Sequence, residues 1–266
     1  MTLIYCLAQN SCVSQNTILA EANTQHDIKY LIQGDFKILE MDNLGDLYLI
    51  DQKNQLSKFN IDGQVKFEFS IKGLGDISSI DVSNPQKILL YFPQYQNIIF
   101  LDNTLSEIKR LNLEELNYWD IQGVANSRDN NIWIHDPVNN RLLKINSEGA
   151  IQLSSNEVFN SKIEEIGSSR IYERNNRVFL YYENIIYEFD SFGQLIQTFM
   201  LTNQGIQFES ESLFFLDQDQ ISMMDYQVHF TAEDQFKKIY DTIKIRDFVV
   251  AQSELWIIDD KGLFKI

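Results

Sequence analysis

The sequence has few of the residues that would indicate a particular catalytic or metal-binding function. Only two cysteines, Cys6 and Cys12, occur among its 266 residues, and both lie near the N-terminus. The remainder of the chain therefore offers no cysteine for a disulfide, a thiolate metal site or a nucleophile. The sequence also has no run of 18 apolar residues, so we expect no membrane-spanning helix.

Positive charge is scarce as well. Lys and Arg number 22 against 38 Asp and Glu, which gives a formal net charge of −16. The only adjacent basic pairs are Lys109-Arg110 and Lys237-Lys238. Because so acidic a protein repels phosphate backbones, we expect no nucleic-acid partner.

Motifs for catalysis and metal binding are missing too. The three histidines, His26, His135 and His229, are far apart in the sequence, and no Gly-x-Ser-x-Gly or phosphate-binding glycine loop occurs. The run DQDQ at 217–220 matches half of a calcium loop but lacks the glycine and the later glutamate, so a hairpin turn explains it better. We therefore predict a protein that is not an enzyme and has no cofactor and no metal site.

The first 25 residues differ from the rest. Met1–Ala8 is a short apolar run without a preceding Lys or Arg, and the residues after it show no strand periodicity. One interpretation is a partial or clipped secretory signal, and the other is a flexible N-terminus. A lipid anchor on Cys12 is rejected because Gln9 and Asn10 precede it. We predict a leader over residues 1–25 and export to the periplasm, with the cytoplasm as the alternative.

Short strand patterns separated by turns fill the chain from Phe36 onward. The first group has four strands, Phe36–Met41, Asp46–Ile50, Gln55–Asn60 and Gln64–Phe69. Only 11 Gly and 3 Pro are present, so most turns must use Asn, Asp, Ser and Gln. Apolar residues make up 44% of the chain, which is sufficient for a large core.

One turn motif recurs at a regular interval. Phe59–Val65, Ile145–Ile151 and Phe189–Leu195 share an apolar residue, Asn or Asp, two variable residues, Gly, any residue and an apolar residue. Leu101–Leu105 is a weaker copy that is one residue short and lacks Gly, and Phe230–Phe236 has Asp in the glycine place. The five copies begin 41 to 44 residues apart. Four strands at this period are typical of a β-propeller blade.

The two ends of the pattern complement each other. After the fifth copy, Ile243–Val250, Glu254–Asp259 and Leu263–Ile266 supply only three strands, while Asp27–Ile32 is a strand without a blade of its own. Pairing the first strand with the last three removes two open edges. We predict a single domain over residues 27–266, an all-β, six-bladed β-propeller of four-stranded antiparallel blades. An N-terminal strand completes the last blade and closes the ring.

The repeated turn, as in Lys58–Gly63 and Lys144–Gly149, follows apolar strands that end in Asp, such as Asn131–Asp136. This pattern resembles the NHL- and SMP-30-like six-bladed propellers over almost the whole predicted domain. The stretches at 80–91 and 97–102 also resemble exported propellers of the Bacteroidetes, among them the plug subunit of the type IX secretion translocon. That resemblance implies a non-enzymatic, periplasmic, protein-binding subunit that closes the mouth of an outer-membrane translocon barrel.

Aromatic residues at the junctions of strands and turns are the candidate protein-binding residues. Side chains there could line a face of the ring, although packing between blades is the better explanation for any one of them. The candidates are Tyr91, Phe92, Tyr95, Tyr118, Trp119, Tyr181 and Tyr182.

The alternative function is a calcium-dependent hydrolase of the lactonase type, which resembles this chain in its propeller fold. Such enzymes hold calcium at the axis through oxygen ligands on the inner strands. Glu40, Asp81 and Asp247 fall on predicted inner strands. The other three blades offer Gln122, Arg170 and the aromatics of Leu213–Phe215, so we expect an incomplete oxygen cage.

Overall fold

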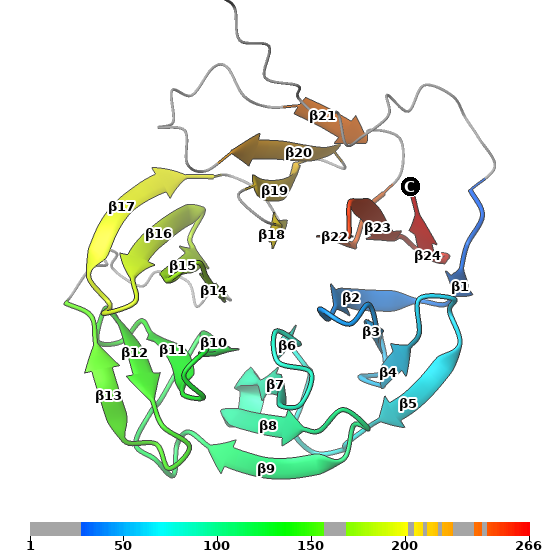
Figure 1. Ribbon diagram of the computed structural model, residues 1–266. Helices are drawn as coiled ribbons and strands as arrows, with labels where there is room; N and C mark the ends of the chain where they lie inside the picture. Colours follow the sequence, from blue (N-terminus) through cyan, green and yellow to red (C-terminus); the bar gives the residue numbers. More distant parts are fainter. Residues whose placement is uncertain are drawn as a thin grey trace, which may run out of the picture.

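The fold is a ring of six four-stranded antiparallel sheets around a central axis, as Figure 1 shows. The computed structural model describes residues 28–156, 169–201, 205–209, 212–217, 220–225, 237–240 and 244–266. The predicted all-β, six-bladed propeller is therefore confirmed. The leader predicted for residues 1–25 lies outside the described residues. Within the described part of the chain, no helix is long and apolar enough to cross a membrane.

Each blade begins at the axis and ends at the perimeter (Figure 1). Blade 1 contains β2 (Phe36–Met41), β3 (Leu47–Asp51), β4 (Leu56–Phe59) and β5 (Val65–Phe69). Blade 2 contains β6 (Ser79–Asp81), β7 (Ile88–Phe92), β8 (Asn97–Leu101) and β9 (Glu107–Asn112), with the short 3-10 helix η1 (Pro93–Tyr95). Blade 3 contains β10 (Gly123–Asn126), β11 (Ile132–Asp136), β12 (Arg141–Ile145) and β13 (Ile151–Ser154).

The remaining blades have the same order. Blade 4 contains β14 (Arg170–Arg174), β15 (Arg177–Tyr182), β16 (Ile185–Asp190) and β17 (Leu195–Met200). Blade 5 contains β18 (Gly205–Glu209), β19 (Ser212–Asp217), β20 (Gln220–Asp225) and β21 (Lys237–Tyr240). Blade 6 contains β22 (Asp247–Ala251), β23 (Glu254–Ile258), β24 (Gly262–Lys265) and the N-terminal β1 (Ile32–Gln33).

The core lies between neighbouring blades. The second and third strands of blades 1 to 4 and of blade 6 are mostly buried, as in β7, where all five residues are buried. Their side chains cluster across blade boundaries. For example, Trp133 of blade 3 packs with Val178 and Tyr182 of blade 4. Each blade therefore covers the apolar face that its neighbour exposes, as a closed propeller requires.

The repeated turn connects the third and fourth strands of a blade and explains the regular shape of this outer hairpin. Asn60 accepts hydrogen bonds on Oδ1 from the backbone N–H of Asp62 and of Gln64, at 3.2 and 2.8 Å. Asn146 and Asp190 make the same pair of bonds in their own turns. The glycine that follows has φ of 77 to 83° in these three turns, which Gly adopts without steric cost.

The second blade has the same turn, which corrects the sequence interpretation. Asp102 accepts from the N–H of Thr104 and of Ser106, and Leu105 takes the glycine place with φ of 60°. Leu101, the first residue of this copy, pairs with Glu107, whereas the first residue of each of the three clear copies pairs with an apolar residue. The turn is therefore full length and not one residue short. The copy at Phe230–Phe236 lies outside the described residues.

The ring closes as predicted, although over a shorter stretch. β1 pairs antiparallel with β24, with Ile32 opposite Leu263, and the N–H of Leu31 donates to the carbonyl of Leu263 at 2.8 Å. The strand begins at Ile32, whereas the sequence predicted Asp27–Ile32. A Cβ on Gly262 would lie 2.1 Å from the carbonyl oxygen of Ile32, so this closure needs glycine there.

The fifth blade corrects one assignment. The sequence interpretation put Leu213–Phe215 on the inner strand, but these residues belong to β19, the second strand. The inner strand is β18, which brings Gln207 toward the axis. A second strand is buried on both faces and is therefore strongly apolar, which made it look like the innermost one.

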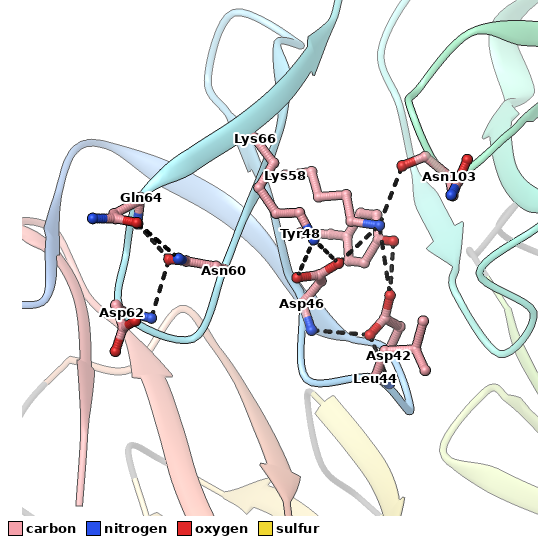
Figure 2. Close-up of polar contacts among 10 residues, drawn as sticks. All are labelled: Asp42, Leu44, Asp46, Tyr48, Lys58, Asn60, Asp62, Gln64, Lys66 and Asn103. Carbon is pink, nitrogen blue, oxygen red and sulfur yellow. Dashed lines mark hydrogen bonds and ion pairs between the residues drawn. The ribbon is translucent and has the colours of Figure 1, made fainter.

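A buried polar network fills the interior of blade 1, as Figure 2 shows. Lys58 on β4 stacks over the ring of Tyr48, 4.9 Å from its centroid, and its Nζ lies 3.1 Å from Asp46 Oδ2 and 3.8 Å from Asp42 Oδ2. Asp42 also accepts hydrogen bonds from the Tyr48 hydroxyl and from the N–H of Leu44 and of Asp46. We call these four residues, Asp42, Asp46, Tyr48 and Lys58, the blade 1 network.

Candidate functional site

A pocket of about 980 Å³ lies at the propeller axis and is lined by all six blades. The inner strands each contribute side chains: Glu40, Asp81, Asn126, Arg170, Gln207 and Val249 are among them. The mouth is formed by residues that follow these strands, such as Asn43, Arg128 and Gln252. The pocket therefore opens on the face where the inner strands end.

A group of polar side chains lies near the axis: Glu40, Arg170 and Gln207 line the pocket, and Asp247 is buried and does not line it. The Gln207 amide donates to Glu40 Oε1 at 3.2 Å. Asp247, which is almost fully buried, accepts hydrogen bonds from the N–H of Leu39 and of Phe248, each at 3.0 Å. Both carboxylates act electrostatically on Arg170. We call Glu40, Arg170, Gln207 and Asp247 the axial cluster.

The surroundings shift the titration of the axial cluster. Burial, followed by the charge of Asp247, raises the pKa of Glu40 to about 8, so this carboxyl is protonated near neutral pH. Burial also raises the pKa of Asp247. For Arg170, burial opposes the charge, but Tyr172, Asp247 and Glu40 raise its pKa above the usual value. The cluster thus combines a neutral acid with a permanently charged guanidinium, a combination that a ligand-binding or catalytic site can use.

Two of the three predicted axial carboxylates join blades. Asp81 accepts from the N–H of Asn126 in the next blade at 2.7 Å, and Asp247 accepts from Leu39 in blade 1. Among the described residues, no three His, Cys, Asp or Glu side chains are grouped so that they could hold a metal ion. Gln122 does not line the pocket; it is half-buried, and its side chain donates to the carbonyl of Asp120. Asp81 and Asp247 therefore take part in hydrogen bonds between blades.

Four of the seven aromatic candidates are buried in packing roles. Tyr91, Phe92, Tyr118 and Tyr182 are each at most 9% exposed. The Tyr91 hydroxyl donates to the carbonyl of Ile121 at 2.6 Å, and the Tyr118 hydroxyl donates to that of Gly149 at 2.7 Å. Tyr181 is half-buried on β15. Packing between and within blades therefore accounts for these side chains.

The other two candidates, Tyr95 and Trp119, are exposed and close together in the fold. Their exposed fractions are 54% and 56%. Gln96 ties their segments to each other: its Oε1 accepts from the N–H of Ile121 at 2.9 Å, and its Nε2 donates to the Ile121 carbonyl at 3.3 Å. Because Tyr95 follows a second strand and Trp119 precedes an inner strand, the pair lies on the face opposite the pocket mouth.

His135 is a buried structural residue. It is fully buried, its Nδ1 lies 3.0 Å from Ser169 Oγ, and its ring meets that of Tyr182 edge to face at 4.6 Å. Burial lowers the pKa of His135 to about 3, so it stays neutral. His26 and His229 lie outside the described residues.

Sequence reasoning missed Gln207 and Tyr172 as members of the pocket. The Tyr172 hydroxyl donates to the carbonyl of Ile206, which links blades 4 and 5 beside the axial cluster. No motif marks either residue. Their only signal is the position on an inner strand, which for Gln207 required β18 to be assigned correctly.

Comparison with known proteins shows similarity of fold alone. No family model matches the chain, and no curated protein matches its sequence. A streptogramin B lyase structure has a TM-score of 0.59 at 15% identity and covers 89% of this chain and 86% of its own. Virginiamycin B lyase from Staphylococcus aureus, solved with quinupristin, has a TM-score of 0.57 at 16% identity over 88% and 81%.

A third similar structure is the β-propeller domain of Cps50 (Swd1) from Myceliophteria thermophila, with a TM-score of 0.60 at 10% identity over 90% of this chain and 89% of that one. The neighbours therefore include lyases as well as a propeller domain of another kind. At such low identity they support the propeller ring and do not assign an activity. Neither the NHL-like type nor the translocon plug receives support from them.

Proposed function

We propose that this chain is a non-enzymatic protein-binding propeller, and that the face carrying Tyr95 and Trp119 contacts the partner. The observation that carries the proposal is the exposure of these two aromatic side chains on segments held together by Gln96. Large aromatic side chains on a rigid surface are typical anchors of protein interfaces. Little ordering entropy is lost when such a prearranged surface binds.

The electrostatic character of the chain favours particular partners. With a net charge of −16, the ring attracts basic surfaces and repels acidic ones. Asp81 and Asp247 hold neighbouring blades together, so these two carboxylates have structural roles. A basic protein surface with a pocket for an aromatic ring is the partner that fits these features.

The test is binding to the partner recovered by affinity isolation from envelope membranes. We expect the Tyr95→Ala/Trp119→Ala double variant to bind at least about tenfold more weakly, because it lacks both aromatic anchors of the interface. Leu44→Ala, which removes a 70% exposed apolar side chain from blade 1, is the matched control. Equal binding by the double variant and the control would show that the aromatic pair is not the interface.

A more specific form of the proposal is a periplasmic subunit of a secretion complex, the plug of the type IX translocon. It rests on the sequence resemblance alone. The same isolation separates it from the general proposal: recovery of an outer-membrane barrel supports the plug, whereas recovery of some other protein that needs Tyr95 and Trp119 retains the binding function and rejects the plug.

The second candidate is a hydrolase, including the calcium-dependent lactonase type. The observation in its favour is Glu40, a protonated acid in an open pocket beside Arg170. Thermal melting during a calcium titration tests the calcium form, because a specific ion must stabilise the state that it binds. A concentration-dependent rise in Tm that Glu40→Gln abolishes would favour this candidate over a pure binding module.

A further inference from the structure

The outer edges of the blades differ in charge. β5 carries Lys66 and Glu68, β9 carries Glu107, Lys109 and Arg110, and the sequence of β21 begins with two lysines. By contrast, residues 191–201, which include all of β17, contain no charged side chain. Charges on edge strands normally prevent unwanted pairing with other chains. Blade 4 lacks this protection over its whole outer strand.

β17 also exposes apolar side chains. Leu195 and Ile196 are 42% and 43% exposed, Met200 is 79% exposed, and Phe192 in the preceding turn is 75% exposed. In the described sheet, the strand order is β14-β15-β16-β17, so β17 has a neighbour on one side only. Its other side can accept a further strand through backbone hydrogen bonds. The uncharged strand of blade 3, β13, is shorter, with four residues.

Both ends of β17 are acidic. Asp190 belongs to the turn that leads into the strand and is only half-buried. At the other end, the N–H of Leu201 donates to the carbonyl of Asn184 at 2.7 Å, which places the exposed Glu183 beside the end of the strand. Six residues in extended conformation span about 20 Å. An uncharged, apolar edge of this length therefore lies between two carboxylates.

We propose that β17 is a second interaction surface. An extended apolar segment of a partner protein, with basic residues at both ends, pairs with it as an additional strand. The alternating side chains of such a segment would pack on Leu195, Ile196 and Met200, and its Lys or Arg residues would meet Glu183 and Asp190. A second copy of this chain fits less well, because it also carries a net charge of −16 and the same acidic ends.

The surface is distinct from the face that carries Tyr95 and Trp119, so the two proposals can fail separately. The probe is a fluorescent synthetic peptide of alternating valine and threonine with two lysines at each end. Fluorescence anisotropy with the full chain measures its affinity. We expect Ile196→Lys to weaken binding about tenfold or more, because it puts a charge into the apolar contact and repels the peptide.

Three controls make the result specific. The Tyr95→Ala/Trp119→Ala variant should bind the peptide as the unaltered chain does. A peptide with alternate backbone amides methylated keeps the charge but cannot pair as a strand, and it should not bind. Glu183→Lys should weaken the lysine-flanked peptide and strengthen a glutamate-flanked one, an exchange that a folding defect does not produce.

The outcomes that overturn the proposal are equally defined. Equal binding of the methylated and unmethylated peptides would mean attraction by charge alone. Unchanged binding by Ile196→Lys would place the peptide elsewhere on the ring. Dimers in analytical ultracentrifugation that Ile196→Lys dissociates, without peptide binding by the unaltered chain, would identify a second copy as the occupant of β17.

Discussion

The blade 1 network and the axial cluster each contain one cation and two carboxyl groups, but the carboxyl groups are in different environments. In the blade 1 network, Lys58 is 3% exposed, yet it faces two carboxylates and an aromatic ring. In the axial cluster, Glu40 lies near Asp247, and burial together with that charge keeps it protonated. In the first group the cation and both carboxylates come from one blade, whereas in the second they come from blades 1, 4 and 6.

This difference separates two uses of buried charge. The blade 1 network holds β3, β4 and the turn after β2 in place, so its charges serve the fold. The axial cluster has an accessible cavity beside it and one carboxyl whose protonation is easily changed. A carboxyl group that is kept protonated near neutral pH can change its charge when a ligand binds beside it.

The largest expected effect is the loss of Asp42 from the blade 1 network. Asp42→Ala removes a charge beside buried Lys58 and three hydrogen bonds to Leu44, Asp46 and Tyr48. We expect a loss of about 3–5 kcal/mol in the free energy of unfolding, because buried Lys58 loses one of its two carboxylates and three hydrogen-bond donors lose their acceptor. Urea denaturation measures it. A loss below about 1 kcal/mol would mean that Asp46 alone compensates Lys58.

An intermediate effect is expected for Glu40→Gln, and it depends on pH. The pKa of Glu40 is raised from 4.5 to about 8, so the folded state binds one more proton than the unfolded state between these values. Its stabilising contribution is full below pH 4.5 and is lost as the pH rises toward 8. The slope is at most about 1.4 kcal/mol per pH unit.

The variant should lack that part of the decline. Urea denaturation from pH 5 to 8 therefore compares the two chains directly, and their difference isolates Glu40 from other titrating groups. Parallel stability profiles would show that Glu40 is ionised in the folded state, and the contrast with the blade 1 network would disappear.

The smallest effect is expected at an exposed ion pair, which serves as the reference for the two changes in stability predicted above. Lys265 and Glu254 lie 2.8 Å apart with side chains 45% and 39% exposed. Glu254→Gln should change the free energy of unfolding by less than about 1 kcal/mol, since water screens this pair. A larger loss, comparable to that of Asp42→Ala, would mean that burial does not distinguish these charges.

The propeller could be predicted because the sequence signals that mark its strands and turns are local. Each turn motif contains its own hydrogen-bonding Asn or Asp and its own residue with positive φ, so Phe59–Val65 and Ile145–Ile151 reveal the period without knowledge of the fold. Closure was predictable from an unpaired strand at each end. The limits of that strand were not, because Ile28–Tyr30 share the apolar pattern of Ile32 but do not pair as a strand.

The axial cluster was less predictable because it depends on contacts between distant blades. Glu40 and Gln207 are 167 positions apart and come from blades that are not neighbours in the ring. Similarly, the sequence places seven aromatics at junctions but does not show which side chains point into the core. Tyr95 and Tyr91 stand four positions apart, yet one is exposed and the other is buried.

The pairing of β1 with β24 has a consequence for synthesis on the ribosome. Blades 1 to 5 each consist of four consecutive strands and can assemble as the chain emerges. Blade 6 instead needs Ile32 and Leu263, which are 231 positions apart in the chain. The segment around Ile32 therefore stays unpaired while the five blades between are made. Closing the ring is a late step of folding, and it is the step at which a chaperone or partner has the longest time to act.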